Sequence, residues 1–514
     1  GVLAHRRRRH RRDPGRVGDR LLERAELPLS IRRALWGVDG EQERAVVARA
    51  ERLAHLENTL PDRLDVTPSV EDGERLAVLE DAVVLVGRRA RGDLGDAAYQ
   101  FVHFLAKSKQ SLWQVLPLNP PGYGNSPYGC LSSEAGNPLL ISPQRLLQDA
   151  LITPAIVGLV PEFDRHRTQF DEVRVWKGRL LREAWSNFQK GDWPAMRRAV
   201  SHFEAEEREW LDDFALYMAI KEAHGFAPWW AWPDGLAQRE PTALKKARRE
   251  LNQEVHFQKF IQFLFFRQWR AIREAAAERE ITIMGDVPIY VAQDSADVWA
   301  NRELFQLDES GAPTVVAGVP PDYFSATGQR WGNPLYRWDV LRESGYRWWI
   351  SRIRTNLELT DIVRLDHFRG FAAYWEIPAH EPTAIHGRWM PGPGKPLFDA
   401  LRHALGSLPL VAEDLGFITP EVHELRQAID VPGMRVLQFG FGQPDSPHLP
   451  HRFEARSVVY TGTHDNDTAL GWFRHASEAE RDLARAYLGD DCNDISWALI
   501  RAAYTSVAET AIVP

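Results

Sequence analysis

Cysteine is scarce in this chain, and its scarcity excludes the small disulfide-stapled folds. The 514 residues contain two cysteines, Cys130 and Cys492, and the sequence shows no signal-peptide pattern. Two cysteines are also too few for the usual structural zinc site. We therefore expect a protein of the reducing cytoplasm, without a disulfide framework. No apolar run approaches the ~18 residues of a membrane-spanning helix, so we expect no membrane partner.

Neither sign of charge is in large excess. The formal net charge is −8, and 26% of the residues are charged. The chain as a whole therefore presents no surface suited to a polyanion, and we expect no nucleic-acid partner. Residues 5–12, HRRRRHRR, are the exception. This run could be a nucleic-acid-binding arm, but beside a negatively charged body it is more typical of a solvated, disordered tail.

Two signatures of cofactor and metal chemistry are missing as well. No glycine-rich phosphate loop follows an early strand, which disfavours a doubly wound nucleotide-binding sheet. His367 and His464 lack the HExxH or paired-histidine spacing of metal ligands, and Arg364 would oppose a cation. We expect no metal and no cofactor.

Tryptophan, in contrast, is abundant, and apolar strands alternate with helical segments. The 19 tryptophans carry flat rings that suit the faces of sugars, although many will be core. Short apolar runs between turn-forming residues predict strands within residues 76–86, 111–118, 281–289, 361–370, 409–416, 434–439, 457–464 and 509–514. Strands that alternate with helices predict an α/β fold, a (β/α)₈ TIM barrel whose site lies at the carboxyl ends of its strands.

The length of the chain allows such a barrel to be elaborated. We predict an atypical helical and basic extension over residues 1–80 and the catalytic barrel over residues 81–514. A large helical and aromatic insertion, about 119–277, and a long irregular segment, about 304–340, interrupt the barrel. Irregular segments of that length usually cover a binding site. The sequence ends in the eighth predicted strand, so we expect the last helix of the barrel to be missing.

The stretch 361–370, DIVRLDHFRG, places ionisable groups at the end of an apolar strand. Because side chains alternate along a strand, Arg364 and Asp366 share one face. A nearby guanidinium favours the ionised carboxylate, and an anion fixed at a strand end is a candidate nucleophile. Taken alone, such a pair is more often a structural ion pair.

Two other predicted strands also end in carboxylates, Glu413 and Asp465. On a barrel these strand ends converge with Asp366 on one crevice, and two carboxylates at one centre suit glycoside transfer. Glu413 follows three apolar residues, so burial would keep it protonated as an acid. Asp465, which His464 precedes, would bind sugar hydroxyls and stabilise an oxocarbenium-like transition state.

Six long motifs carry a family resemblance. In chain order they are GYGNSPYG, GDVPIYVAQDSADVW, VVAGVPPDYFSATGQRWGNPLYRWD, VRLDHFRGFAAYWEIPA, VAEDLGFITPEV and YTGTHDNDTALGW. From about Gly92 to the C-terminus the sequence resembles the 4-α-glucanotransferases, the amylomaltase or disproportionating-enzyme family (glycoside hydrolase family 77) of the α-amylase clan. The resemblance implies transfer of a segment of an α-1,4-glucan or maltooligosaccharide to the 4-hydroxyl of another sugar, with glucose as one acceptor.

The resemblance also implies roles for individual residues. Asp366 would be the nucleophile, Glu413 the acid/base and Asp465 the transition-state stabiliser. The residues expected to bind substrate are Arg364, His367 and His464 at the subsite of the cleaved sugar, Asp286 in support of it, Tyr323, Phe324, Trp331 and Asn333 in the substrate-covering segment, and Tyr128 at a secondary glucan-binding surface.

Three departures from the family pattern leave alternatives open. Gly129 stands where the family usually has glutamine, and the region before Gly92 lacks the family's usual first strand and glycine-rich loop. Family members also continue past the position of Pro514. The alternatives are an α-glucan hydrolase of the same clan and an inactive glucan-binding protein.

Overall fold

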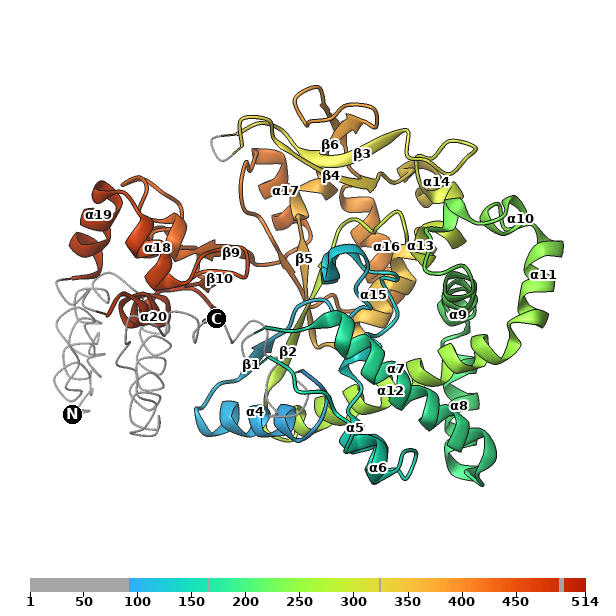
Figure 1. Ribbon diagram of the computed structural model, residues 1–514. Helices are drawn as coiled ribbons and strands as arrows, with labels where there is room; N and C mark the ends of the chain where they lie inside the picture. Colours follow the sequence, from blue (N-terminus) through green and yellow to red (C-terminus); the bar gives the residue numbers. More distant parts are fainter. Residues whose placement is uncertain (1–91, 165–166, 323–324, 490–493) are drawn as a thin grey trace, which may run out of the picture. The chain divides into compact units, whose positions relative to one another are not determined.

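The computed structural model describes residues 92–164, 167–322, 325–489 and 494–514 (Figure 1). These residues fall into two compact units, a larger one that ends at Met434 and a smaller one formed by residues 435–513. The strand expected within residues 76–86 and the extension expected over residues 1–80 lie outside the described residues.

A parallel sheet organises the larger unit. Its strands are hydrogen-bonded in the order β1, β2, β5, β8 and β9. The strand residues that directly precede Asp366 and Glu413 are buried. The bounds are Leu112–Gln114 for β1, Thr282–Pro288 for β2, Ile362–Asp366 for β5, Leu410–Ala412 for β8 and Gly433–Val436 for β9. Each of these strands lies within a predicted one or within a residue of it, because apolar β-branched runs are what a sheet covered on both faces requires.

The smaller unit contains the end of β9 and two further strands, β10, Ser457–Tyr460, and β11, Thr510–Ile512. In the strand order of the sheet, β10 follows β9 and β11 follows β10. β10 and β11 pair in parallel, with Val458 opposite Thr510. Among the described residues of this unit, three α-helices accompany them: α18, Ala469–His475; α19, Glu478–Leu488; and α20, Ile495–Thr505. A core of its own joins these helices to β10, with Leu437, Val459 and Leu499 fully buried.

Helices fill the chain between β1 and β2, where the sequence analysis expects an insertion. The longest is α12, 26 residues whose aromatic side chains are mostly buried. The helices of this segment are α5, Pro143–Gln148; α6, Pro154–Val157; α7, Phe170–Lys190; α8, Pro194–Glu206; α9, Arg208–Ala223; α10, Asp234–Ala237; α11, Pro241–Glu250; and α12, Asn252–Ala277. Six more α-helices lie in the described part of this unit: α4, Asp96–Lys107; α13, Ala296–Ala300; α14, Trp338–Glu343; α15, Arg347–Leu359; α16, Lys395–Leu405; and α17, Pro420–Ala428.

A second, antiparallel sheet corrects one prediction. The segment expected to be irregular, about 304–340, contributes two strands, β3 and β4, to a sheet of order β4, β3, β6, β7. The bounds are Val315–Val319 for β3, Gln329–Pro334 for β4, Ala373–Pro378 for β6 and Arg388–Pro391 for β7. β4 reads QRWGNP and is largely exposed, so it has neither the apolar run nor the alternation that identifies a strand in a sequence.

Parallel strands that alternate with helices make this a TIM-type α/β barrel, as predicted; seven strands of its sheet lie in the described part of the chain. Cys130 is a buried free thiol, and Cys492 lies outside the described residues. Among the described residues, no helix combines the length and the apolar character needed to cross a membrane.

Candidate active site

Asp366 and Glu413 occupy neighbouring positions at the carboxyl ends of β5 and β8. The register pairs Leu365 with Ala412, so the next residues along the two strands face each other. Backbone hydrogen bonds continue this register, because the Glu413 amide donates to the Leu365 carbonyl at 3.0 Å and the Phe368 amide donates to the Glu413 carbonyl at 3.1 Å. Residues opposite each other in parallel strands project from the same face. The two carboxyl groups therefore lie side by side.

Arg364 connects Asp366 to a second, fully buried carboxylate. Its Nη2 lies 3.1 Å from Asp366 Oδ1, and its Nη1 donates to both oxygens of Asp286 at 2.8 and 2.7 Å. The Asp286 side chain is 0% exposed and that of Arg364 3%, whereas Asp366 is 28% exposed. A guanidinium held by a buried carboxylate on one side is thus presented to a partly exposed carboxylate on the other, as the shared face of Arg364 and Asp366 predicted.

Tyr128 belongs to the same chain of contacts, which corrects its expected position. Its hydroxyl donates to Asp286 Oδ2 at 2.6 Å, and burial together with the charge of Asp286 raises the pKa of the phenol well above its usual value. The prediction that Tyr128 serves a separate, secondary surface is wrong. The SPY segment instead reaches the carboxyl end of β2 and completes the support of Arg364.

Glu413 has the electrostatic environment of a carboxylic acid. Burial, and after it the negative charge of Asp366, raises the pKa of Glu413 to about 8; Arg364 and two backbone N–H groups act in the opposite direction. Those N–H groups belong to His367 and Leu415, and they donate to the Glu413 oxygens at 2.7 and 3.0 Å. The carboxyl group is fixed in position but carries a proton at neutral pH.

His367 links the strand end to the segment expected to cover the substrate. It has φ 50°, in the left-handed region that is sparsely populated by residues other than glycine and is found at functional sites. Burial and the charge of Arg369 lower the pKa of His367 to about 3, so its ring is neutral. The partly exposed Trp331 ring of β4 meets the His367 ring edge to face, with centroids 4.8 Å apart. Asn333 is turned to the Val291 carbonyl, to which its amide donates at 2.9 Å.

Arg369, which the sequence did not single out, contacts two exposed aromatic residues. Its guanidinium lies 3.8 Å from the centroid of the Trp389 ring and donates to the Phe417 carbonyl. Trp389 is 36% exposed and Phe417 69% exposed. An arginine three residues after Asp366 could have been selected from the sequence. Its partners could not, because they come from β7 and from the loop after β8.

Asp465 and His464 follow β10 in the smaller unit. The Asp465 amide donates to Thr463 Oγ1 at 3.3 Å, and Asn466 Oδ1 accepts from the Thr463 amide at 2.8 Å, so a compact turn carries the carboxylate. The Asp465 side chain is 75% exposed and lies 3.5 Å from His464 Nε2. Their approach to Asp366 and Glu413 stays a prediction. Tyr323 and Phe324 lie outside the described residues.

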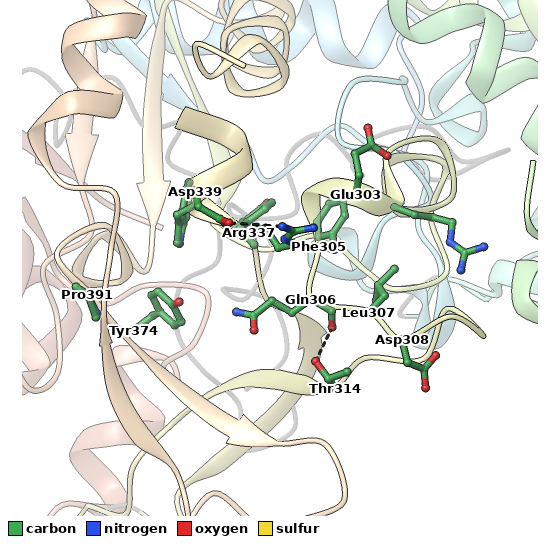
Figure 2. Close-up of a pocket in the computed structure, with 13 residues that line it drawn as sticks. Glu303, Phe305, Gln306, Leu307, Asp308, Thr314, Arg337, Asp339, Tyr374 and Pro391 are labelled. Atoms are coloured by element: carbon green, nitrogen blue, oxygen red, sulfur yellow. Dashed lines mark hydrogen bonds and ion pairs between the residues drawn. The ribbon is translucent and has the colours of Figure 1, made fainter. Parts of the chain in front are cut away.

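A cavity of about 730 Å³ lies elsewhere in the larger unit (Figure 2). None of the predicted site residues lines it. Its aromatic lining residues, Phe305, Tyr336, Trp338 and Tyr374, are all buried, so they offer no ring face to a sugar. Within the described ranges, no three His, Cys, Asp or Glu side chains gather in a way that could hold a metal ion.

Comparison with known proteins gives a consistent result. The family model described as 4-alpha-glucanotransferase matches residues 85–514. The chain is 50% identical over 435 residues to the 4-alpha-glucanotransferase of Synechocystis, covering 84% of this chain and 86% of that one. It is 49% identical to that of Thermus thermophilus, covering 84% and 87%. Among solved structures, the amylomaltase from Streptococcus agalactiae in complex with acarbose superposes with a TM-score of 0.81 at 36% identity, covering 84% of this chain and 88% of that chain.

The match includes the strand ends that carry Asp366, Glu413 and Asp465, and it extends through both compact units. The predicted activity, transfer of 4-α-glucanosyl segments, is confirmed by the family model and by these relatives, and nothing in them favours the hydrolase or the inactive binding protein. The chain belongs to the 4-α-glucanotransferase family.

Proposed function

We propose that the chain transfers a segment of an α-1,4-glucan to the 4-hydroxyl of an acceptor glucose or glucan through a covalent glycosyl-enzyme intermediate, with Asp366 as nucleophile and Glu413 as acid/base. The observation that carries this proposal is the unequal environment of two carboxyl groups in register. Asp366 lies 3.1 Å from a guanidinium, while the pKa of Glu413 is raised to about 8. One anion and one neutral acid side by side are what a retaining double displacement requires.

The spacing of the strands supports the retaining course. Adjacent strands lie about 4.8 Å apart, and retaining enzymes hold their two carboxyl groups about 5 to 5.5 Å apart. In the first step Asp366 attacks the anomeric carbon while Glu413 gives its proton to the leaving glycosidic oxygen. In the second step Glu413 accepts a proton from the acceptor hydroxyl, which attacks the same carbon and releases Asp366.

Asp465 and His464 are proposed to complete the site from the turn after β10. An exposed carboxylate held by backbone and threonine hydrogen bonds is suited to bind sugar hydroxyls and to stabilise positive charge in the transition state. The exposure of Asp465, at 75%, supports a role that needs contact with a ligand rather than with the core.

The cleaved sugar is proposed to lie against Arg364 and His367, with Asp286 and Tyr128 holding the guanidinium from behind. A neutral imidazole can donate one hydrogen bond and accept another, which matches a sugar hydroxyl. Trp331, over His367, would cover this sugar together with Tyr323 and Phe324, and Asn333 would hold the strand that carries Trp331. A covered site excludes water and so favours a sugar acceptor over hydrolysis.

The substrates are proposed to be α-1,4-glucans and maltooligosaccharides, with glucose as an acceptor, in the cytoplasm and without nucleic-acid or membrane partners. The acarbose complex of the streptococcal amylomaltase supports α-glucan-like ligands. The buried free thiol of Cys130 supports a reducing compartment.

Incubation of the purified chain with maltotriose tests the transfer reaction. We expect glucose together with oligosaccharides longer than maltotriose, and Asp366→Asn should lower turnover on the order of 10³-fold or more while oligosaccharide binding is retained. Asp399→Asn, at an exposed helical ion pair, is the matched control and should behave as wild type. Glucose and maltose alone would indicate a hydrolase, and full activity of Asp366→Asn would refute the nucleophile.

A further inference from the structure

The Met434 side chain contacts the guanidinium that serves the nucleophile. Arg364 Nε donates to Met434 Sδ at 3.4 Å, and the methionine is fully buried. The other two nitrogens of the guanidinium face Asp286 and Asp366. A guanidinium is planar, so contacts at all three nitrogens define its orientation and not only its position.

Met434 is itself held in place by the carboxylate that follows the acid/base. Asp414 Oδ1 accepts from the Met434 amide at 2.7 Å, and Asp414 Oδ2 lies 3.3 Å from Arg426 Nε. The Asp414 side chain is 0% exposed and that of Arg426 4%. Gly433 makes this approach possible, because a Cβ at that position would lie 2.3 Å from Asp414 Oδ2.

These contacts form one continuous path. It runs from the buried ion pair of Asp414 with Arg426, through the start of β9, to the thioether of Met434, then to Arg364 and finally to Asp366. A thioether is a weak acceptor, so the bond to Arg364 adds little stability by itself. Its effect is geometric, because a packed side chain behind Nε resists the rotation that would carry Nη2 away from the nucleophile.

We propose that Met434 and Asp414 are positioning residues for the reaction. Asp414 fixes the backbone of Met434, and Met434 fixes the plane of the Arg364 guanidinium, so that its Nη2 edge stays directed at Asp366. Neither residue touches the reacting atoms. The inference rests on the proposed function of Asp366 as nucleophile.

The test compares Met434→Leu, which keeps the volume but removes the acceptor, with Asp414→Asn and with the double variant. We expect kcat for maltotriose disproportionation to fall about 10- to 100-fold in each single variant with KM within about twofold, since small misplacements of a catalytic group have effects of this size. Met218→Leu, on α9, and Asp399→Asn are matched controls for the two substitutions.

Two readouts separate positioning from a merely structural role. A less ordered Arg364 favours the Asp366 anion less, so the acid limb of the pH profile of kcat/KM should move to higher pH in Met434→Leu. The double variant should be no worse than the more damaging single variant, because both act along one path. An unmoved acid limb, a kcat within twofold of wild type, or additive losses would each overturn the proposal. If Asp366→Asn were active, Asp366 would not be the nucleophile and the proposed function itself would fail. If Asp366→Asn were inactive but the Met434 and Asp414 variants behaved as wild type, only the positioning roles would fail.

Discussion

Glu413 and Glu134 are two glutamates of the larger unit whose pKa is raised to about 8, yet they differ in what surrounds them. In both, burial is the leading cause. Asp366, which has a guanidinium at 3.1 Å, raises the pKa of Glu413 further. For Glu134 the further contributions come from Asp297 and Glu209, while a 2.6 Å hydrogen bond from Ser351 Oγ opposes them.

The difference shows that a raised pKa does not by itself mark a catalytic acid. Glu134 is 6% exposed and its neighbour Asp297, on α13, is 5% exposed and accepts hydrogen bonds from Ser133. Glu134 accepts from Ser351 of α15, so the two carboxyl groups connect one loop to α13 and to α15. Glu413 stands at a strand end beside a carboxylate that is 28% exposed. What distinguishes the catalytic candidate is a carboxylate partner that a ligand can reach, together with a guanidinium fixed 3.1 Å from that partner.

The sharpest way to break the comparison is the same substitution at both positions. Glu413→Gln removes the proton donor and should lower kcat about 10²- to 10⁴-fold, the usual range for general acid catalysis. Glu134→Gln keeps an acceptor for Ser351 and should leave kcat within about twofold of wild type. Initial rates of disproportionation measure both, and equal losses would show that burial rather than placement decides the role.

The pH profile gives a second, smaller contrast. Glu413 must be protonated to act as the acid, and its pKa is raised to about 8, so kcat/KM should fall as pH rises through about 8. Glu134→Gln should leave this basic limb in place, although the pKa of Glu134 has the same value. A limb that moved in Glu134→Gln would assign the titration to the wrong glutamate.

The sequence was sufficient for the parallel strands and for the two carboxylates that end them. β2, β5 and β8 are buried on both faces, and such strands are apolar runs that a reader of the sequence can find. Alternation along β5 also placed Arg364 with Asp366. These features depend on neighbours along the chain, so they are visible without a fold.

The antiparallel sheet and the supports of Arg364 could not be found in this way. β4 and β7 are mostly exposed and contain proline, so neither has a strand pattern. The Tyr128 hydroxyl meets Asp286 across 158 positions of sequence, and Arg364 meets Met434 across 70. Contacts between residues so far apart in the sequence depend on which strands become neighbours in the sheet. The residues around one tyrosine or one methionine do not reveal that order.

The smallest expected effect concerns stability and applies to the structural glutamate alone. The pKa of Glu134 is raised to about 8 in the folded chain from an ordinary value of 4.5, so the folded state binds more protons than the unfolded state between those values. The contribution of Glu134 to the free energy of unfolding therefore decreases as the pH rises from about 4.5 to about 8. Above about 8 it no longer changes with pH.

Glutamine does not titrate, so Glu134→Gln removes this dependence. Relative to wild type, its Tm should rise by about 2 °C between pH 5 and pH 8, a shift that corresponds to a modest change in unfolding free energy for a chain of this size. Differential scanning calorimetry at the two pH values, with Asp399→Asn as a control that should show no such difference, measures it. A Tm difference that stays constant with pH would mean that Glu134 is ionised in the folded chain between pH 5 and pH 8. Glu134 and Glu413 would then share burial but not a raised pKa.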